Sequence, residues 1–323
     1  MPEISVLIPS YNRADLLPRA LLSVWQQDFD DMEVLVVDDG SSDGTIKWLD
    51  QQQKTHPQLR FVVHDHNKGE AAARNTALRE ARGTYLAFLD SDDEWLPGKL
   101  AAQHRHMVSA PPDVAAVITA AYLVDGETKT LADDWHLREP VTVRNLLVQG
   151  CGLNLNNTIL MKRETALAAG DYDESLRLYV DVDWLMRFLS KGRVDVIPEP
   201  YAVYYKAPWR QGRLVEDAAI AFRRKNATAF DALSRSDRRR AAATLAWNSA
   251  ICYRSDGDKW NYLRQASKAL ALWPWVPVGN YLAIPDMFTG GRLLPAARRL
   301  RSRLAGGSSN KLPAANPRNH RSK

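Results

Sequence analysis

The first half of the chain alternates short apolar runs with segments of helical periodicity, and this alternation strongly constrains the fold. Residues 4–8 and 85–89 are continuous apolar runs, as in strands buried on both faces of a parallel sheet. Strand–helix–strand alternation predicts an α/β fold with a mostly parallel sheet flanked by helices. The predicted strands are residues 4–8, 33–37, 61–63, 85–89, 115–121 and 194–197, and the predicted helices are 14–27, 44–53, 70–81 and 97–108.

The overall composition is that of an ordinary globular protein. The chain has 323 residues, of which 45% are hydrophobic and 25% charged, enough for one large domain or two smaller ones. No apolar stretch reaches the roughly 18 residues expected of a membrane span, and Met1-Pro2-Glu3 leads directly into a strand-like run. Cys151 and Cys252 are too few for a disulfide framework. We therefore expect a cytoplasmic protein without a signal peptide.

The second half of the chain has a different pattern. Apolar residues recur at helical spacing from Leu214, and further helical stretches follow at 237–254 and 260–272. The last residues are rich in Gly, Ser, Asn and Pro together with basic residues, a composition typical of disorder. The predicted organisation is a first domain over residues 1–210, an α-helical appendage over 211–303 and a disordered basic tail over 304–323.

The positive charge is concentrated at the carboxyl end. Residues 290–323 carry nine Lys or Arg residues and no acid, so the formal net charge of +5 leaves −4 for residues 1–289. Aromatic residues precede this stretch within 273–303, and aromatic and basic residues together are typical of segments at a membrane interface. Two interpretations stay open, namely peripheral contact with an anionic membrane surface and a solubilising tail. A nucleic-acid partner is not expected.

Three acids crowd the end of one predicted strand. Asp90, Asp92 and Asp93, with Ser91 among them, directly follow the apolar run 85–89. Neighbouring carboxylates repel one another, so we expect a positive group among them. A hard divalent cation, Mg²⁺ or Mn²⁺, that also holds phosphate oxygens is a natural candidate. The alternative is an acidic turn or helix cap, where Asp and Ser are also common.

Polar residues also follow two other predicted strands. Residues 9–13 (PSYNR) come after the first strand and residues 38–44 (DDGSSDG) after the second. In an open parallel sheet, ligands bind in the crevice outside the carboxyl ends of the strands. Three strands therefore bring polar side chains to one edge of the sheet, and this convergence predicts a binding site there.

The mixture of side chains at this edge indicates a nucleotide diphosphate bridged to the protein by a cation. Tyr11 offers a flat face for a base, and Asp39 offers an acceptor for a base N–H. Arg13 and Arg74 carry guanidinium groups that suit phosphate. Partial packing of Tyr11 in the core is the alternative for that residue. Asp43 is better explained as the cap of the helix that follows it.

Residues 67–75 (NKGEAAARN) open a predicted helix that can bind an anion. Gly69 permits close approach of the backbone, and the positive end of a helix favours phosphate. No Gly-x-Gly-x-x-Gly fingerprint follows the first strand, and no Gly-Lys-Ser/Thr phosphate loop occurs. These observations argue against a dinucleotide dehydrogenase and a classical NTPase.

Four motifs together resemble the signature of family-2 glycosyltransferases with the GT-A fold. They are residues 4–13 (ISVLIPSYNR), 36–43 (VVDDGSSD), 67–75 (NKGEAAARN) and 89–93 (LDSDD). They occur in the order typical of the family, and the resemblance spans about residues 4–205. It implies a GT-A catalytic domain over residues 1–210 that transfers a sugar, with inversion, from a nucleotide-diphosphate donor, often UDP, to an acceptor hydroxyl.

The resemblance also implies roles for individual residues. Asp181, in the stretch 180–187 (VDVDWLMR), falls on the position of the family's catalytic base. Without the resemblance it would be a helix-start carboxylate favoured by the helix dipole. Asp92 falls on the metal-ligand position. The implied donor-binding residues are Pro9, Tyr11, Arg13, Asp39, Gly69, Arg74, Asp90 and Ser91.

Two positions depart from the family pattern. Val180 stands where the first acid of an acidic pair is usual, and Pro208 stands where many relatives place a His near the metal. The Gln-x-x-Arg-Trp motif and the membrane spans of processive synthases are absent, which favours transfer of a single sugar. Trp209 and Arg210 could close over the donor. Residues 134–158, with Trp135, Asn154, Asn156 and Asn157, are expected on the acceptor side.

The predicted partners are a nucleotide-sugar donor and a glycan or lipid-linked acceptor, in cell-surface polysaccharide or glycolipid synthesis. The protein is expected to be cytoplasmic and peripheral to the inner face of the membrane. Two alternative functions stay open. A sugar nucleotidyltransferase would also use an acidic metal site but would release pyrophosphate, and a non-catalytic relative would only bind a glycan or a membrane.

Overall fold

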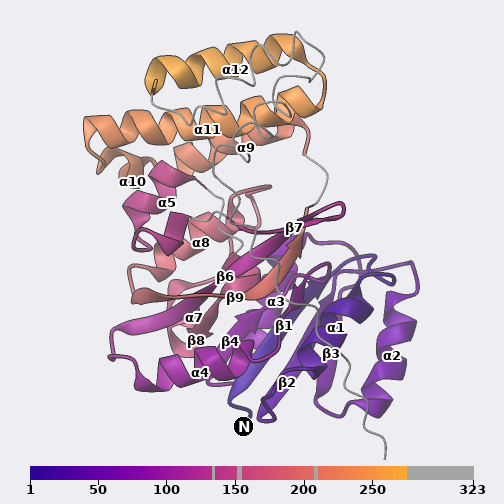
Figure 1. Ribbon diagram of the computed structural model, residues 1–323. Helices are drawn as coiled ribbons and strands as arrows, with labels where there is room; N and C mark the ends of the chain where they lie inside the picture. The colour runs from indigo at the N-terminus through magenta and orange to yellow at the C-terminus, as the bar shows by residue number, and fades with distance from the viewer. Residues whose placement is uncertain (133–134, 151–154, 207–209, 275–323) are drawn as a thin grey trace, which may run out of the picture.

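The computed structural model describes residues 1–132, 135–150, 155–206 and 210–274 (Figure 1). Its centre is a nine-stranded sheet with the strand order β3-β2-β1-β4-β8-β6-β9-β5, and β7 pairs with β6 outside this path. Residues from 275 onward are not described, so the predictions for the aromatic and basic stretch 273–303 beyond Pro274 and for the tail 304–323 lie outside the described residues. The same holds for the predictions at Cys151, Asn154, Pro208 and Trp209. Among the described residues, no helix is both long and apolar enough to cross a membrane.

The amino-terminal half of the sheet is parallel, as predicted. β2 pairs with β1 and β3, and β1 pairs with β4, all in the parallel sense. Alternate residues of β1 enter opposite cores: Leu7 packs in the core that includes α3, whereas Val6 and Ile8 pack in the core that includes α1. The elements of this half are β1 (Ile4–Ser10), α1 (Leu17–Trp25), β2 (Met32–Asp38), α2 (Thr45–Thr55), β3 (Leu59–Val63), α3 (Glu70–Glu80) and β4 (Tyr85–Phe88).

The other half of the sheet is mixed. β8 runs antiparallel to both β4 and β6, while β9 runs parallel to β6. The short β5 joins the end of β9 in the antiparallel sense. The elements here are β5 (Glu94–Trp95), α4 (Lys99–Ser109), β6 (Val114–Asp125), β7 (Thr128–Leu131), a 3₁₀ turn (Trp135–Leu137), α5 (Val143–Gln149), α6 (Leu155–Thr158), β8 (Leu160–Lys162), α7 (Arg163–Ala169), α8 (Val180–Phe188) and β9 (Arg193–Tyr205).

One strand prediction is wrong at its boundary. The strand expected to end before Pro198 and Pro200 continues to Tyr205. The ladder between β6 and β9 shifts register between Thr119 and Ala120, next to these prolines. Proline lacks an N–H and is tolerated in a strand at such irregularities, so the strand passes through both prolines. Its far end then pairs with β5, next to the acidic loop.

The carboxyl-terminal helices form a layer stacked above the sheet in Figure 1. The antiparallel pair α11 and α12 has its own small core around Trp247 and Tyr262. Phe222 and Phe230 of the same layer belong to the core shared with α3 and α8. The helices are α9 (Gly212–Lys225), α10 (Ala227–Asp231), α11 (Arg235–Ser255) and α12 (Lys259–Leu272). These elements match the predicted helical appendage, whose boundary near residue 210 stays a prediction.

A buried carboxylate joins this layer to the first turn of α8. Asp183, with 1% of its side chain exposed, accepts hydrogen bonds from Lys225 Nζ at 2.9 Å and Asn226 Nδ2 at 3.0 Å. Arg187 lies 3.4 Å from the same carboxylate. Lys225 also pairs with Asp173, in the loop that precedes α8. Contacts between the end of α9 and the start of α8 therefore fix both elements.

Asp183→Asn should destabilise the protein by about 3 kcal/mol, because it removes the charge of a buried group that holds Lys225 and Asn226. Urea unfolding measures this loss. Asp231→Asn, which removes an exposed partner of Arg238, is the matched control and should cost less than about 1 kcal/mol. Equal effects of the two variants would show that Asp183 does not fasten the helical layer.

Candidate active site

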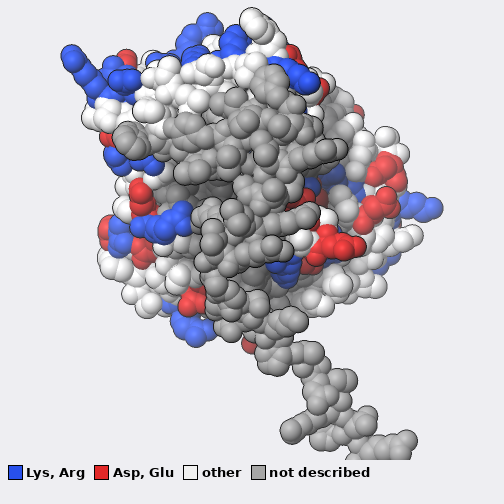
Figure 2. All heavy atoms as spheres, turned by 45° about the horizontal axis from the view of Figure 1, so that its top comes forward, with Lys and Arg blue, Asp and Glu red and all other residues white. Residues whose placement is uncertain are grey.

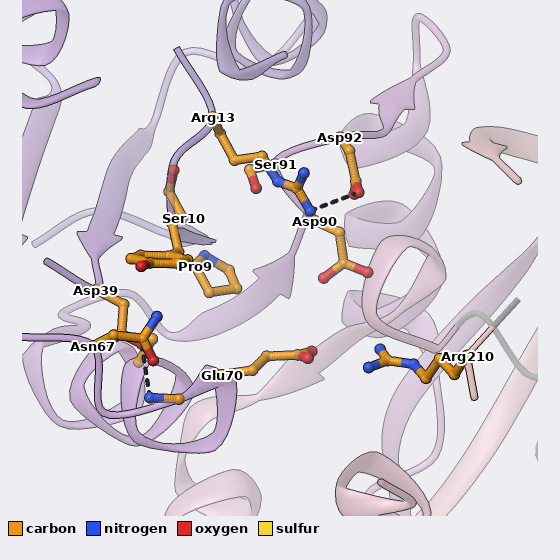
Figure 3. Close-up of a pocket in the computed structure, with 13 residues that line it drawn as sticks. Pro9, Ser10, Arg13, Asp39, Asn67, Glu70, Asp90, Ser91, Asp92 and Arg210 are labelled. Carbon is orange, nitrogen blue, oxygen red and sulfur yellow. Dashed lines mark hydrogen bonds and ion pairs between the residues drawn. The ribbon is translucent and has the colours of Figure 1, made fainter. Parts of the chain in front are cut away.

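The polar residues at the ends of β1, β2 and β4 converge on one cavity of about 340 Å³. Figure 3 shows the cavity with the strand ends and the start of α3 around it. All the predicted donor-binding residues except Arg74 line this cavity, and so does Asp92. Ser10, Asn67, Glu70, Ala73 and Arg210 also contribute. We call this the donor cavity; its lining residues are Pro9, Ser10, Tyr11, Arg13, Asp39, Asn67, Gly69, Glu70, Ala73, Asp90, Ser91, Asp92 and Arg210.

Asp39 fixes the loop that enters α3. Its Oδ1 accepts the Lys68 N–H at 2.9 Å and lies 2.6 Å from His64 Nδ1, and its Oδ2 accepts the Gly69 N–H at 2.7 Å. Gly69 has φ +98°, a conformation that side-chain-bearing residues rarely adopt. A carboxylate has about four acceptor positions, so Oδ2 keeps capacity for an N–H of a ligand. The side chain is otherwise committed to shaping the cavity wall.

The three acids after β4 are all held by other side chains, and Asp90 and Asp93 share Asn157 as a partner. Arg13 Nη2 lies 3.2 Å from Asp92 Oδ2, so a guanidinium stands beside the predicted metal ligand. Asp93 faces inward, where it accepts the Tyr205 N–H at 2.8 Å and a hydrogen bond from Asn157. Burial raises the pKa of Asp93 to about 8, and the charge of Asp90 adds to the effect. The positive group expected among these acids is therefore partly supplied by the chain itself.

Arg74 does not line the donor cavity itself but pairs with two residues that do, Glu70 and Asp90. Only 2% of its side chain is exposed, and Nη2 lies 2.9 Å from Asp90 Oδ1 and also bonds Glu70. Its guanidinium carbon lies 5.5 Å from the ring centroid of Phe88 and 5.9 Å from that of Tyr172. Burial alone would lower the pKa of Arg74, but the charges of Glu70 and Asp90 outweigh it and raise the pKa.

The two acids beside Arg74 respond differently to it. Arg74 lowers the pKa of Glu70 more than burial raises it. Burial raises the pKa of Asp90 to about 6, although Arg74 partly opposes the shift. Asp90 also binds Asn157, because its N–H donates to Asn157 Oδ1 at 2.6 Å. Figure 3 shows Asp90, Glu70 and Arg210 directed toward one another across the cavity.

A second cavity of about 220 Å³ adjoins the first and contains the predicted base. It shares Glu70, Asp90 and Arg210 with the donor cavity. Asp181 lies at the start of α8, and burial raises the pKa of its carboxyl while the charge of Arg74 partly offsets this. We call it the base cavity; it is lined by Glu70, Arg74, Asp90, Asn156, Arg177, Leu178, Tyr179, Val180, Asp181 and Arg210.

The backbone is strained next to the predicted base. Tyr179 precedes α8 with φ +63°, which is uncommon for a residue with a side chain and costs of order 1 kcal/mol or more. Its ring packs against Phe222 of α9, with centroids 5.2 Å apart. Val180, where the family pattern has an acid, lines the base cavity with an aliphatic side chain. Asp181 thus has no carboxylate neighbour at the preceding position.

Several lining residues were absent from the predicted site. Glu70 has a local signal, since an acid four residues before Arg74 on a helix favours an ion pair. Arg177 had no such signal, because its position at the base cavity depends on how the loop before α8 folds. Asn156 and Asn157 were expected on the acceptor side; Asn156 lines the base cavity, whereas Asn157 is buried against the acidic loop. The side chain of Trp135 lies outside the described atoms.

The donor cavity contains carboxylates that could supply part of the coordination shell of a divalent cation. Among the described side chains, no group of three or more His, Cys, Asp or Glu residues is placed to hold a metal ion. Mg²⁺ in nucleotide sites is usually held by one or two carboxylates together with substrate phosphates and water. Asp92, with a third of its side chain exposed, and Asp90 both line the donor cavity and satisfy that requirement.

The chain matches the family model of glycosyl transferase family 2 over residues 5–167, about half of its length. It belongs to that family. The GalNAc(5)-diNAcBac-PP-undecaprenol beta-1,3-glucosyltransferase of Campylobacter jejuni is 40% identical over 101 residues, which cover 31% of this chain and 33% of the relative. The UDP-Glc:alpha-D-GlcNAc-diphosphoundecaprenol beta-1,3-glucosyltransferase WfgD of Escherichia coli is 41% identical over 101 residues, covering 31% and 39%. The chain therefore aligns with less than half of these relatives' length.

Solved structures share the architecture along nearly the whole chain. S. aureus TarS 1-349 superposes with a TM-score of 0.59 at 18% identity, covering 95% of this chain and 92% of the other. The mannosyltransferase PcManGT of Pyrobaculum calidifontis gives a TM-score of 0.57 at 22% identity, covering 94% and 85%. At these identities the likeness shows the fold alone, which is that of the GT-A glycosyltransferases. The predicted fold class is confirmed.

Arg74→Met should cost about 3–5 kcal/mol in unfolding free energy, because it leaves Glu70 and Asp90 beside a buried site without their cation. The double variant Arg74→Met/Asp90→Asn should recover part of the loss, since one uncompensated charge is gone. Urea unfolding measures both values.

The control for this prediction is Arg79→Met, on the same helix, which removes an exposed ion pair with Asp171. It should cost at most about 1 kcal/mol. If Arg74→Met cost no more than Arg79→Met, the buried ion pair would not be the support that its geometry indicates.

Proposed function

We propose that the protein transfers one sugar from a nucleoside-diphosphate donor, with UDP favoured, to a hydroxyl of a lipid-linked glycan, and inverts the anomeric centre. The observation that carries this proposal is the pair of adjoining cavities. One is lined by the residues expected to bind the donor, the other contains Asp181, and they share Glu70, Asp90 and Arg210. A donor and an acceptor placed in them would meet at the shared wall.

The charges of the donor cavity favour a divalent cation with the donor. Its lining includes four carboxylates (Asp39, Glu70, Asp90 and Asp92) and two guanidiniums (Arg13 and Arg210). A diphosphate adds further negative charge to this excess, so its binding requires compensation. In the proposed arrangement Asp92, with Asp90 nearby, would hold Mg²⁺ or Mn²⁺, which would offset charge on the leaving diphosphate.

The remaining chemistry follows from the residues of the chain. Tyr11, with 44% of its surface exposed, offers a face to the base, and Asp39 Oδ2 offers an acceptor. Asp181 accepts the proton of the acceptor hydroxyl while the hydroxyl oxygen bonds to the anomeric carbon. The bond from that carbon to the donor phosphate oxygen breaks, and the nucleoside diphosphate leaves with the electron pair. Attack from the face opposite the leaving group inverts the centre.

The relatives support the donor and acceptor classes. The two undecaprenol glucosyltransferases are named for diphosphoundecaprenol-linked acceptors, and WfgD for a UDP-Glc donor. TarS structures contain UDP and UDP-GlcNAc, and the PcManGT structure contains GDP-Man and Mn²⁺. A role in cell-surface polysaccharide or glycolipid synthesis is consistent with these names.

The charge distribution supports a position at the inner face of a membrane. Residues 212–272 carry twelve Lys or Arg and six Asp or Glu residues, whereas residues 1–211 have a net charge of −9. Figure 2 shows Lys and Arg side chains along the upper rim, over the carboxyl-terminal helical layer. A basic layer would approach anionic lipid headgroups, where a lipid-linked acceptor resides.

The direct test is incubation of the full chain with a panel of nucleotide sugars and Mn²⁺, followed by identification of the released product. A glycosyltransferase releases a nucleoside diphosphate when it transfers or slowly hydrolyses its donor. Release of pyrophosphate would indicate a nucleotidyltransferase instead. No release from any donor, together with no binding of UDP, would contradict the proposed function.

Asp181→Asn should lower the transfer rate by about 10²–10⁴, the usual contribution of a general base, while UDP affinity stays unchanged. Because burial raises the pKa of Asp181, the wild-type rate should fall on acidification with a midpoint above about 3.9, the ordinary value for Asp. A pH profile of the transfer rate measures this limb, which the variant should lack. Asp171→Asn is the control, and near-normal turnover of Asp181→Asn would reject the assignment.

Asp92→Asn should weaken the binding of UDP in the presence of Mn²⁺ by about tenfold or more, equivalent to about 1.4 kcal/mol. It should change binding without metal much less, because the carboxylate acts through the cation. Calorimetric titration with and without Mn²⁺ gives both affinities. Asp50→Asn, on the exposed face of α2, is the charge-matched control. Equal loss under the two conditions would mean that Asp92 does not hold the cation.

A further inference from the structure

We propose that the acceptor carries a phosphate attached directly to the sugar that receives the new bond, and that Arg177 binds this phosphate. The inference rests on the proposed function, since it names the acceptor class of the same site. It begins from the loop between α7 and α8, which lines part of the base cavity and ends at Tyr179, two residues before Asp181.

Each acid of this loop has a partner, while its arginine has none among the residues that the structure describes. Within the described residues the side chain of Arg177 forms no ion pair and no hydrogen bond, although it is exposed and lines the base cavity. The acids are held by basic or amide groups from other elements, so they cannot neutralise it. These partners are Arg79 for Asp171, Lys225 for Asp173 and Asn75 for Glu174.

The cavity is lined by a second guanidinium that has no ion-pair partner among the described residues. Arg210 lines it, and its charge acts on Glu70 across the cavity, but within the described residues its side chain forms no ion pair or hydrogen bond. The third guanidinium of the lining, Arg74, is occupied by Glu70 and Asp90. Two unpaired guanidiniums at one cavity favour a polyanionic ligand, because the fork of donors on arginine matches phosphate oxygens. A single carboxylate would satisfy only one of them.

The size of the cavity limits how far the phosphate can lie from the reacting hydroxyl. The base cavity has a volume of about 220 Å³ and contains both Asp181 and Arg177, which are separated by four positions in the chain. This volume suits one sugar ring rather than an oligosaccharide. A hydroxyl at Asp181 and a phosphate at Arg177 therefore belong to one sugar and its anomeric phosphate. The enzyme would add the next sugar to the first residue of a lipid-linked glycan.

The test uses the full chain saturated with UDP and Mn²⁺, so that the donor cavity is filled. Three decyl-chain probes are titrated by calorimetry: α-N-acetylglucosaminyl diphosphate decyl ester, the uncharged decyl N-acetylglucosaminide and decyl glucuronide. The diphosphate probe should bind at least tenfold more tightly than the uncharged one. Arg177→Gln should abolish this difference and Arg177→Lys should keep part of it. Arg105→Gln, an exposed arginine of α4 outside both cavities, should leave it unchanged.

Three results would overturn the inference. Equal affinity for the charged and uncharged probes would show that no phosphate site exists, and preference for the glucuronide would assign the arginine to a sugar carboxylate. A loss of UDP affinity in Arg177→Gln, without loss of the probe difference, would assign Arg177 to the donor. The proposed function would survive each of these results, because it depends on UDP binding and on release of nucleoside diphosphate, which are measured separately.

Discussion

The buried guanidinium of Arg74 is the interaction on which the arrangement of the site depends. A charge so deeply buried is costly unless it is paired, and here Glu70 and Asp90 supply the pairing from α3 and from the loop after β4. The ion pair thereby joins two segments that are separate in the sequence. The rings of Phe88 and Tyr172 lie near the guanidinium, and only 2% of the side chain is exposed.

The positive charge of Arg74 also stabilises the two acids, Glu70 and Asp90, that the donor cavity and the base cavity share. Asp90 and Glu70 border both the donor cavity and the base cavity, the charge of Glu70 opposes ionisation of Asp181, and both acids would oppose entry of the proposed diphosphate. Arg74 lowers the pKa of all three carboxyls against the effect of their surroundings. Without it, burial and the charge of Glu70 would raise the pKa of Asp90 and Asp181 further. In the proposed mechanism, Arg74 therefore supplies a fixed positive charge between the base and the leaving diphosphate.

The sequence was sufficient for the parallel strands β1 to β4 and for the edge where their ends meet, because parallel strands must deliver their carboxyl ends to one side of a sheet, but it gave no indication of β5, β7 or β8. It was insufficient for the partners of the acids. Asp93 is held by Asn157 and by the Tyr205 N–H, both far along the chain, and no local pattern encodes such contacts. Arg13 beside Asp92 is a similar case, since the ion pair depends on how two loops face each other.

The helical layer contacts the start of α8, where the proposed base lies. Asp181 follows Tyr179, whose positive φ is unfavourable for a tyrosine, so the surrounding structure must hold it. Phe222 packs on that ring, and the end of α9 binds Asp183 through Lys225 and Asn226. These contacts fix the turn on both sides of Asp181. The layer is thus better understood as part of the support for the proposed base than as a separate attachment, even though the chain enters it only after residue 210.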